Sequence, residues 1–316
     1  MVSQLSASAV TTGGNGSATT DRLRRLPSHL AAKIRGQQHA LPRICSVLTR
    51  GELGFAHPRR PRGSFLLVGP TGVGKTETTN VFTDYLFDGA APVRFDMSEY
   101  QLQGSVDKLL GESRDDRGLL GRALRTATRG TLLFDEVEKA HPLVLDLFLQ
   151  ILEDARVTLA TGETLDLRPF YIVCTSNIGS EETMRMESAP FASVERTVLM
   201  RVRERLRPEL VGRVNEIVVF GRLDYATQRA ICAGMIESEI ARLSAMGHTV
   251  EVSADAIEFL VRQGYHRSLG ARPMRGAVER FMQDALADAL LRGEKSSGQL
   301  VVTGDGSRLG LIAPTA

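Results

Sequence analysis

The residues best suited to chemistry form one glycine-rich stretch, Gly69-Pro70-Thr71-Gly72-Val73-Gly74-Lys75-Thr76. It fits the pattern G-x-x-x-x-G-K-[ST], follows an apolar segment and precedes a helical pattern. Its glycines let the backbone curl so that successive N–H groups point at phosphate oxygens, and the start of the following helix adds partial positive charge. We expect Lys75 to reach the β- and γ-phosphates of a nucleoside triphosphate and the Thr76 hydroxyl to bind Mg²⁺. The residues expected to line the nucleotide here are Pro70, Thr71, Gly72, Val73, Gly74, Lys75, Thr76 and Glu77.

An acidic pair downstream supplies the second half of such a site. Asp135 and Glu136 end an apolar segment that begins at Thr131. We expect Asp135 to hold Mg²⁺ through water and Glu136 to polarise the attacking water. An acidic pair alone often only caps a strand, so this prediction depends on the glycine-rich stretch before it. Asn177 ends the next apolar segment, where its amide could orient the same water or simply form a turn.

Short apolar segments must position these residues, and longer amphipathic stretches separate the segments. Their length and their content of Val, Ile, Leu and Phe indicate buried parallel strands, hence an α/β fold with helices on both faces of the sheet. After Gly221 the pattern changes to three helices and a hairpin, which predicts a small helical subdomain over 222–316 behind a nucleotide-binding subdomain over 22–221. The expected strands are 64–68, 93–97, 131–137, 170–177 and 216–220.

Composition excludes several classes of protein. The 316 residues are 42% apolar and 24% charged, which is typical of globular chains. Residues 1–21, rich in Ser, Thr, Gly and Ala, are expected to form a disordered tail. No apolar run is long enough to span a membrane, and the three scattered cysteines indicate reduced thiols of a cytoplasmic protein. A net charge of +2 is too small to predict nucleic acid as a partner.

The order of the motifs resembles a known family. The stretches GSFLLVGPTGVGKTE, RFDMSEY, LLFDEVEKAHPLVLDLFLQILEDARVT, TSNIGS, RPELVGRVNEIVVF and LGARPMRGAVER are similar to those of Clp-type AAA+ ATPases, in particular the C-terminal ATPase module of the Clp/heat-shock disaggregases. The resemblance runs from about residue 26 to the end of the chain. It implies a five-stranded parallel sheet in the order 5-1-4-3-2, a helical lid, ATP as the ligand and a homo-oligomeric ring, usually of six subunits.

The resemblance also implies roles for single residues. Asn177 falls at the sensor-1 position, Arg213 at the arginine finger that reaches the γ-phosphate of a neighbouring subunit, and Arg272 at the sensor-2 arginine of the lid. Both guanidinium groups would offset negative charge on the transferred phosphoryl group. The loop on the adenine side is expected to contain Ile34, Gly36 and Gln37.

The sequence departs from the family in two respects. Threading machines of the family carry an aromatic G-Y-V-G type loop that grips polypeptide, whereas the stretch 111–118 here, GESRDDRG, has no aromatic residue. The disaggregases usually also have an N-terminal domain and a second ATPase module, which are not expected in this chain. No Ile-Gly-Phe/Leu loop is evident after the sensor-1 strand, so pairing with a protease is not expected.

Three classes of function follow from these observations. The first is an ATP-hydrolysing ring that remodels a protein substrate. The second is a scaffold that assembles when ATP binds, which the aromatic-free loop favours. The third is an AAA+ protein that acts on nucleic acid, which only clusters of arginine indicate. The substrate and any recruiting adaptor are not encoded in a recognisable motif.

Overall fold

The computed structural model describes residues 15–294 and 296–312 of the chain. Most of the expected tail, residues 1–14, lies outside the described residues. Its last part is helical instead, because the first helix, α1 (Asn15–Lys33), begins at Asn15. Leu23, Leu26 and Leu30 are buried and hold one face of α1 against the core. Once a helix is held in this way, each residue added at its N-terminal end gains one backbone hydrogen bond, so the helix can extend toward Asn15.

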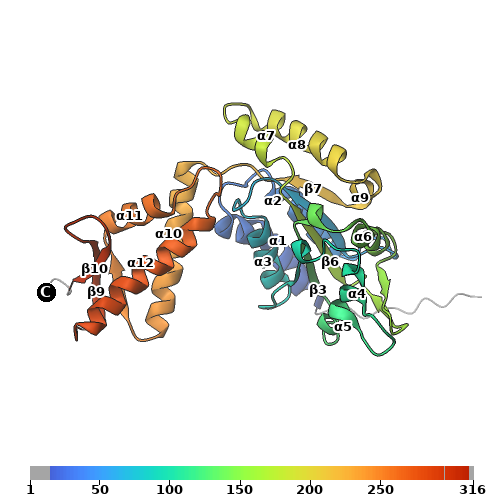
Figure 1. The fold of residues 1–316 in the computed structure, drawn as a ribbon, viewed down its shortest axis with the longest axis horizontal. Helices are drawn as coiled ribbons and strands as arrows, with labels where there is room; N and C mark the ends of the chain where they lie inside the picture. The colour runs from blue at the N-terminus through green and yellow to red at the C-terminus, as the bar shows by residue number, and fades with distance from the viewer. Residues whose placement is uncertain (1–14, 295, 313–316) are drawn as a thin grey trace, which may run out of the picture.

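The centre of the larger subdomain is a five-stranded parallel sheet in the order β2-β3-β6-β1-β7 (Figure 1). Strands β4 and β5 form a separate antiparallel hairpin and are not part of this sheet. When the five strands of the sheet alone are numbered along the chain, their order is 5-1-4-3-2, which confirms the expected order. The strands are β1 (Gly63–Val68), β2 (Val93–Asp96), β3 (Gly130–Asp135), β6 (Phe170–Ser176) and β7 (Glu216–Val219), and the hairpin is β4 (Arg156–Thr158) and β5 (Thr164–Asp166).

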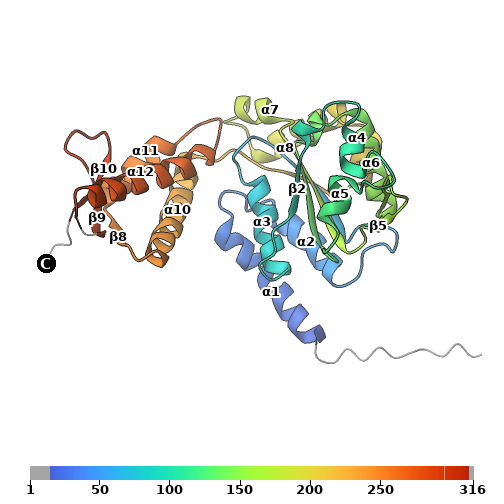
Figure 2. The ribbon, with the colours of Figure 1, turned by 60° about the horizontal axis from the view of Figure 1, so that its bottom comes forward.

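Helices cover both faces of this sheet (Figure 2). Side chains alternate along a strand, so Phe65 and Leu67 of β1 pack into one core while Leu66 and Val68 pack into the other. The first core is completed by α1, α2 (Leu41–Glu52) and α3 (Lys75–Leu86). The second core involves α4 (Ser105–Leu110), α5 (Gly118–Ala123), α6 (Pro142–Asp154), α8 (Phe191–Arg205) and α9 (Pro208–Arg213), and α7 (Ser180–Arg185) precedes α8.

The smaller subdomain contains three helices and a three-stranded sheet. Ser253 caps the second helix through a hydrogen bond from Ala256 N, and the third helix begins beside Pro273. The expected hairpin is present as an antiparallel pair, and a further strand that sequence reasoning missed lies parallel to it. The elements are α10 (Tyr225–Ala245), β8 (Thr249–Val252), α11 (Ala254–Gly264), α12 (Arg272–Leu291), β9 (Ser297–Val302) and β10 (Leu309–Ile312).

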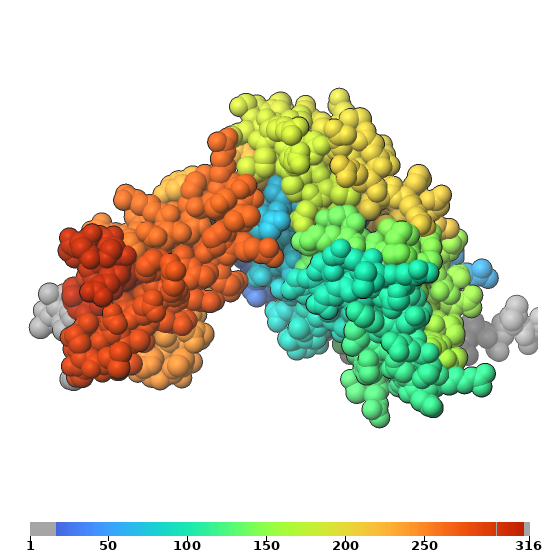
Figure 3. Space-filling view, in the orientation of Figure 1, coloured from blue at the N-terminus to red at the C-terminus, as the bar shows by residue number. Residues whose placement is uncertain are grey.

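The two subdomains meet beside the glycine-rich loop and are separated by an open notch over much of their length (Figure 3). Ala271 N donates a 3.0 Å hydrogen bond to Gly72 O, so the start of α12 rests directly on this loop. None of the helices in the described part of the chain is long and apolar enough to cross a membrane.

Candidate functional site

The glycine-rich loop lies between the carboxyl end of β1 and the first turn of α3. Gly69, Gly72 and Gly74 have φ values of 137°, 73° and 104°, in the left-handed region that side chains other than glycine rarely adopt. Gly72 also has a steric reason to be glycine, because a Cβ there would lie 2.0 Å from Leu269 O of the smaller subdomain. The loop therefore presents its backbone toward the end of the sheet.

Lys75 is buried in this loop. Its Nζ donates to Gly69 O at 2.5 Å, to Pro70 O at 2.8 Å and to Asn177 Oδ1 at 3.0 Å. Burial lowers the pKa of Lys75 to about 8, while the carboxylates of Glu138, Asp135 and Glu136 oppose that effect. The negative charge of these three carboxylates thus favours the charged form of Lys75.

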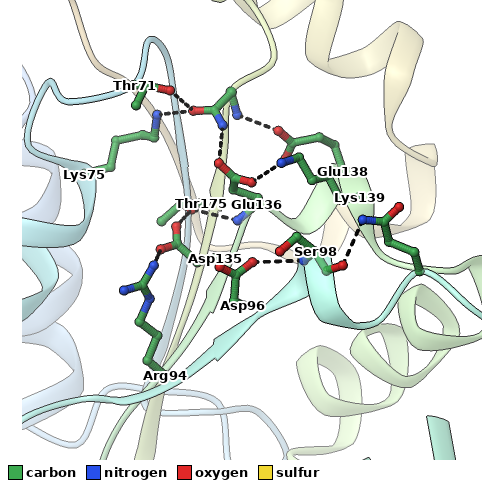
Figure 4. A network of polar contacts seen from close by, with 12 residues as sticks. Thr71, Lys75, Arg94, Asp96, Ser98, Asp135, Glu136, Glu138, Lys139 and Thr175 are labelled. Carbon is green, nitrogen blue, oxygen red and sulfur yellow. Dashed lines mark hydrogen bonds and ion pairs between the residues drawn. The ribbon is translucent and has the colours of Figure 1, made fainter. Parts of the chain in front are cut away.

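Asp135 ends β3 and has two partners. Its Oδ1 accepts a hydrogen bond from the Thr175 hydroxyl, and its Oδ2 forms an ion pair with Arg94 at 2.6 Å (Figure 4). Thr175 also accepts a 3.0 Å hydrogen bond from Glu136 N, so this hydroxyl fixes both members of the acidic pair. Sequence reasoning missed Thr175 and Arg94, because nothing in the local pattern links strands β2 and β6 to the end of β3.

Glu136 and Asn177 face each other across two strand ends. Asn177 Nδ2 donates to Glu136 Oε1 at 2.8 Å, while Oε2 of Glu136 forms an ion pair with Lys139 (Figure 4). The hydrogen bond from Lys139 is the main cause that holds the pKa of Glu136 below its usual value. The amide of Asn177 therefore joins Lys75 on one side to Glu136 on the other.

Glu138 is a further residue that the sequence did not single out. Its Oε1 accepts a 2.9 Å hydrogen bond from Asn177 N, and it is the carboxylate that most strongly favours the charged form of Lys75. Its Oε2 is buried without a hydrogen-bond partner among the described residues. The only available signal was its position two residues after Glu136.

The residues present fit a Mg²⁺–nucleoside triphosphate. Mg²⁺ prefers oxygen ligands and is commonly held by one or two carboxylates together with substrate phosphates. Asp135 and the Thr76 hydroxyl, in the first turn of α3, are the oxygen donors that would hold it. In the described residues no group of three or more His, Cys, Asp or Glu side chains is placed so that it could hold a metal ion by itself.

The expected adenine-side residues lie where α1 leads into α2. Ile34 is 3% exposed and packs in the same core as α3, and Gly36 has a φ of 76°. The Gln37 side chain is fully buried and makes three hydrogen bonds: Nε2 donates to Val73 O at 3.1 Å and to Gly221 O at 2.9 Å, and Oε1 accepts from Gly221 N at 3.0 Å. Gln37 therefore ties the glycine-rich loop to the chain segment between the subdomains.

The two expected arginines occupy different surroundings. Arg272 begins α12 next to Gly72, and its charge lowers the pKa of Lys75 slightly, so it lies on the same protomer's loop. Arg213 ends α9 and forms a 2.8 Å ion pair with Glu153 of α6. The structure thus brings Arg272 to the site and leaves Arg213 away from it. Two other arginines lie near these in the sequence: Arg207, the residue just before α9, pairs with Asp146, and Arg275 lies in the first turn of α12.

Two family models match the chain. Residues 60–217 match the AAA domain (Cdc48 subfamily), and residues 223–303 match the C-terminal, D2-small domain of ClpB protein. The chain belongs to the AAA domain family. The larger subdomain is accordingly an AAA domain, and the smaller one matches the D2-small domain of ClpB.

Relatives and solved structures agree with this assignment. The chain is 37% identical over 298 residues to the chaperone protein ClpB of Aquifex aeolicus, covering 89% of this chain and 29% of that one. It is 37% identical over 294 residues to ClpB of Agrobacterium fabrum, covering 91% and 34%. A closed-state structure of Hsp104 with ATPγS and FITC-casein superposes with a TM-score of 0.84 at 30% identity, covering 93% of this chain and 52% of that one. An ADP complex of Hsp104 from S. cerevisiae gives 0.85 at 29% identity, covering 94% and 53%. The chain spans about a third of the length of these curated relatives.

Proposed function

We propose that this chain is a Mg²⁺-dependent ATPase whose copies assemble into a ring, with six subunits as the expected number. The observation that carries the proposal is the continuous contact from Lys75 through Asn177 to Glu136. A phosphate-binding cation, an orienting amide and a water-polarising carboxylate are the parts that phosphoryl transfer to water requires. The similarity to ClpB and Hsp104 supports the same assignment.

Each residue then has a defined task. Backbone amides of the loop and Lys75 bind the phosphates, and Thr76 and Asp135 would hold Mg²⁺, which would supply positive charge against the phosphate oxygens. Glu136 accepts a hydrogen bond from the attacking water, and Asn177 holds the carboxylate at the correct angle. Arg272 would act on the nucleotide of its own subunit and Arg213 on that of the next.

The similarity to known proteins suggests which process ATP hydrolysis drives. Proteins named as chaperones suggest a protein substrate, so we infer that the ring remodels a protein in the cytoplasm. All three cysteines are buried and free, as expected for a reducing compartment. Nucleic acid is the least supported partner, since the net charge is only +2 and four of the clustered arginines, Arg22, Arg24, Arg201 and Arg207, have acidic partners.

The test is the steady-state ATP hydrolysis of Glu136→Gln. This variant keeps the shape and the hydrogen bond to Asn177 but cannot take up a proton, so turnover should fall by about 100-fold or more while ATP binding persists. Glu181→Gln, an exposed residue of α7, serves as the matched control and should leave turnover unchanged. Unchanged turnover in Glu136→Gln would refute the assignment.

A nucleotide-switched scaffold remains a second candidate because of the stretch 111–118. The structure shows this stretch as a closed turn, in which the Asp116 carboxylate accepts hydrogen bonds from Glu112 N and Gly118 N. Arg117 ties it to Glu163 of the β4–β5 hairpin at 2.6 Å. A closed, charged turn is poorly suited to gripping apolar side chains. ATP-dependent unfolding of a tagged protein would support remodelling, whereas ATP-dependent assembly without unfolding would support the scaffold.

A further inference from the structure

The short helix α9 is held firmly against α6. Leu210 of α9 is 2% exposed and packs in the second core. Ion pairs join the two helices at both ends: Arg207 to Asp146 at the start of α9, and Arg213 to Glu153 at its end. The backbone that carries Arg213 is therefore fixed, and only the side chain is left to move.

Arg213 cannot serve the nucleotide site of its own subunit. Asn215, two residues later, is bonded to Ser64 near the start of β1: its Oδ1 accepts from Ser64 N at 2.8 Å, and its N donates to Ser64 Oγ at 2.9 Å. The phosphate-binding loop follows the other end of β1, after Val68. At about 3.3 Å per residue, the length of the strand separates Arg213 from that loop.

The contact with Glu153 occupies the guanidinium group. The distance between Arg213 Nη2 and Glu153 Oε2 is 2.8 Å, and the side chains are 27% and 58% exposed. A phosphate is recognised by the same N–H donors of a guanidinium as a carboxylate, so Glu153 and a phosphate compete for Arg213. Ion pairs this exposed are weak, so the release is easy.

We propose that Glu153 is a positioning residue that holds Arg213 against its own subunit in competition with the γ-phosphate bound by the neighbouring subunit. This inference rests on the proposed function, in which Arg213 acts across the subunit junction. Glu153 then restrains hydrolysis, because it lowers the fraction of time in which Arg213 is free to reach the phosphate of the neighbouring subunit. A partner that drew Glu153 away would accelerate the ring without touching the nucleotide.

The test is a double-mutant cycle with Glu153→Gln and Arg213→Ala. Glu153→Gln keeps the size of the side chain and removes its charge, so the turnover number should rise about two- to five-fold, the range expected for release of an exposed ion pair. The KM for ATP should stay within about twofold, because the binding loop is untouched. In the Arg213→Ala background, Glu153→Gln should have no effect, since its effect passes through Arg213.

Two controls complete the design. Glu209→Gln makes the same change in charge on α9 at an exposed position and should leave turnover unchanged, and Glu153→Asp should bring turnover back toward that of the original chain. Unchanged or lower turnover in Glu153→Gln, or an equal rise in the Arg213→Ala background, would overturn the inference. Failure of the proposed function looks different: the original chain would not hydrolyse ATP, or Arg213→Ala would hydrolyse it normally.

Discussion

Asn177 is the residue through which the phosphate-binding loop and the acidic pair are connected. Its Oδ1 accepts from Lys75 Nζ at 3.0 Å and from the Thr71 hydroxyl at 3.3 Å, while its Nδ2 donates to Glu136 at 2.8 Å. An amide is suited to this place because it offers an acceptor to a cation and a donor to a carboxylate at once. Neither an acid nor an amine could satisfy both neighbours.

Replacing Asn177 with Ala should therefore lower the turnover number by about 100-fold, the usual effect of removing one positioned donor from a charged site. ATP affinity should change far less, because the loop backbone remains. Steady-state hydrolysis and titration with a fluorescent ATP analogue measure the two quantities separately. Thr71→Ala removes only the longer hydrogen bond and should have the smaller effect; a larger one would contradict this account.

Glu239 gives a prediction about pH within the lid. Hydrogen bonds from Arg242 at 2.6 Å and Gln283 at 3.0 Å hold the pKa of Glu239 below its usual value, with the Arg242 contact the larger cause. A lowered carboxyl pKa stabilises the folded state above the unfolded-state pKa, and that contribution disappears as pH falls through the folded-state pKa. Glu239→Gln should lower the free energy of unfolding by about 1 kcal/mol at pH 7. The difference from the original chain should shrink on acidification below about pH 4. Chemical denaturation at several pH values measures it, and a pH-independent difference would contradict the role of the charge.

At the scale of elements, the junction between the phosphate-binding loop and α12 couples nucleotide binding to the lid. The loop accepts a hydrogen bond from Ala271 N at Gly72 O, and Gln37 bonds both the loop and the segment that leads into α10. Any nucleotide that reshapes the loop must therefore move the lid or strain these contacts.

Gly72→Ala tests this junction. The added Cβ would lie 2.0 Å from Leu269 O, and the alanine backbone would have to adopt a φ of 73°. We therefore expect the free energy of unfolding to fall by about 1–2 kcal/mol and ATP affinity to fall at least tenfold. Gly89→Ala is the matched control: it has a φ of 88° but no atoms within 4 Å of the added Cβ. Gly89→Ala should show the backbone cost in thermal unfolding while ATP affinity stays normal. Equal ATP affinity in both variants would argue against the coupling.

At the scale of the whole molecule, the proposed function requires a second subunit to complete the site. Lys75, Asn177, Glu136 and Arg272 gather at one end of the sheet, and Arg213 lies toward the other end. A head-to-tail ring brings such separated surfaces together at every junction.

Mixing two inactive variants should reveal this arrangement. Glu136→Gln supplies Arg213 but has no working carboxylate, and Arg213→Ala supplies the carboxylate but no finger. An equal mixture that exchanges subunits should recover about a quarter of the original rate, because that share of random junctions pairs the two intact halves. Hydrolysis should also fall when the original chain is diluted until it is monomeric. No recovery on mixing, or a specific activity independent of concentration, would show that each subunit acts alone.

The sequence by itself determined the parts of this protein that depend on near neighbours. The spacing from Gly69 to Thr76 specifies a turn between a strand and a helix, the alternation of apolar segments specifies the sheet, and Ser253 and Pro273 mark helix starts. Such signals act over a few residues and can be recognised without the rest of the chain.

Only the tertiary structure decided which distant residues meet. Lys75 and Asn177 are 102 residues apart, and it is the register between β1 and β6 that brings them within 3.0 Å. Tertiary structure likewise decides the ion pair between Arg94 and Asp135, the hydrogen bond between Gln37 and Gly221, and the ion pair between Glu153 and Arg213. The residues next to a charged side chain at the end of a strand do not indicate which residue it will contact, because that depends on the order of the strands in the sheet and on how the helices pack. The phosphate-binding loop, the acidic pair and Asn177 could therefore be predicted from the sequence, whereas their contacts with Arg94, Thr175 and Glu138 could not.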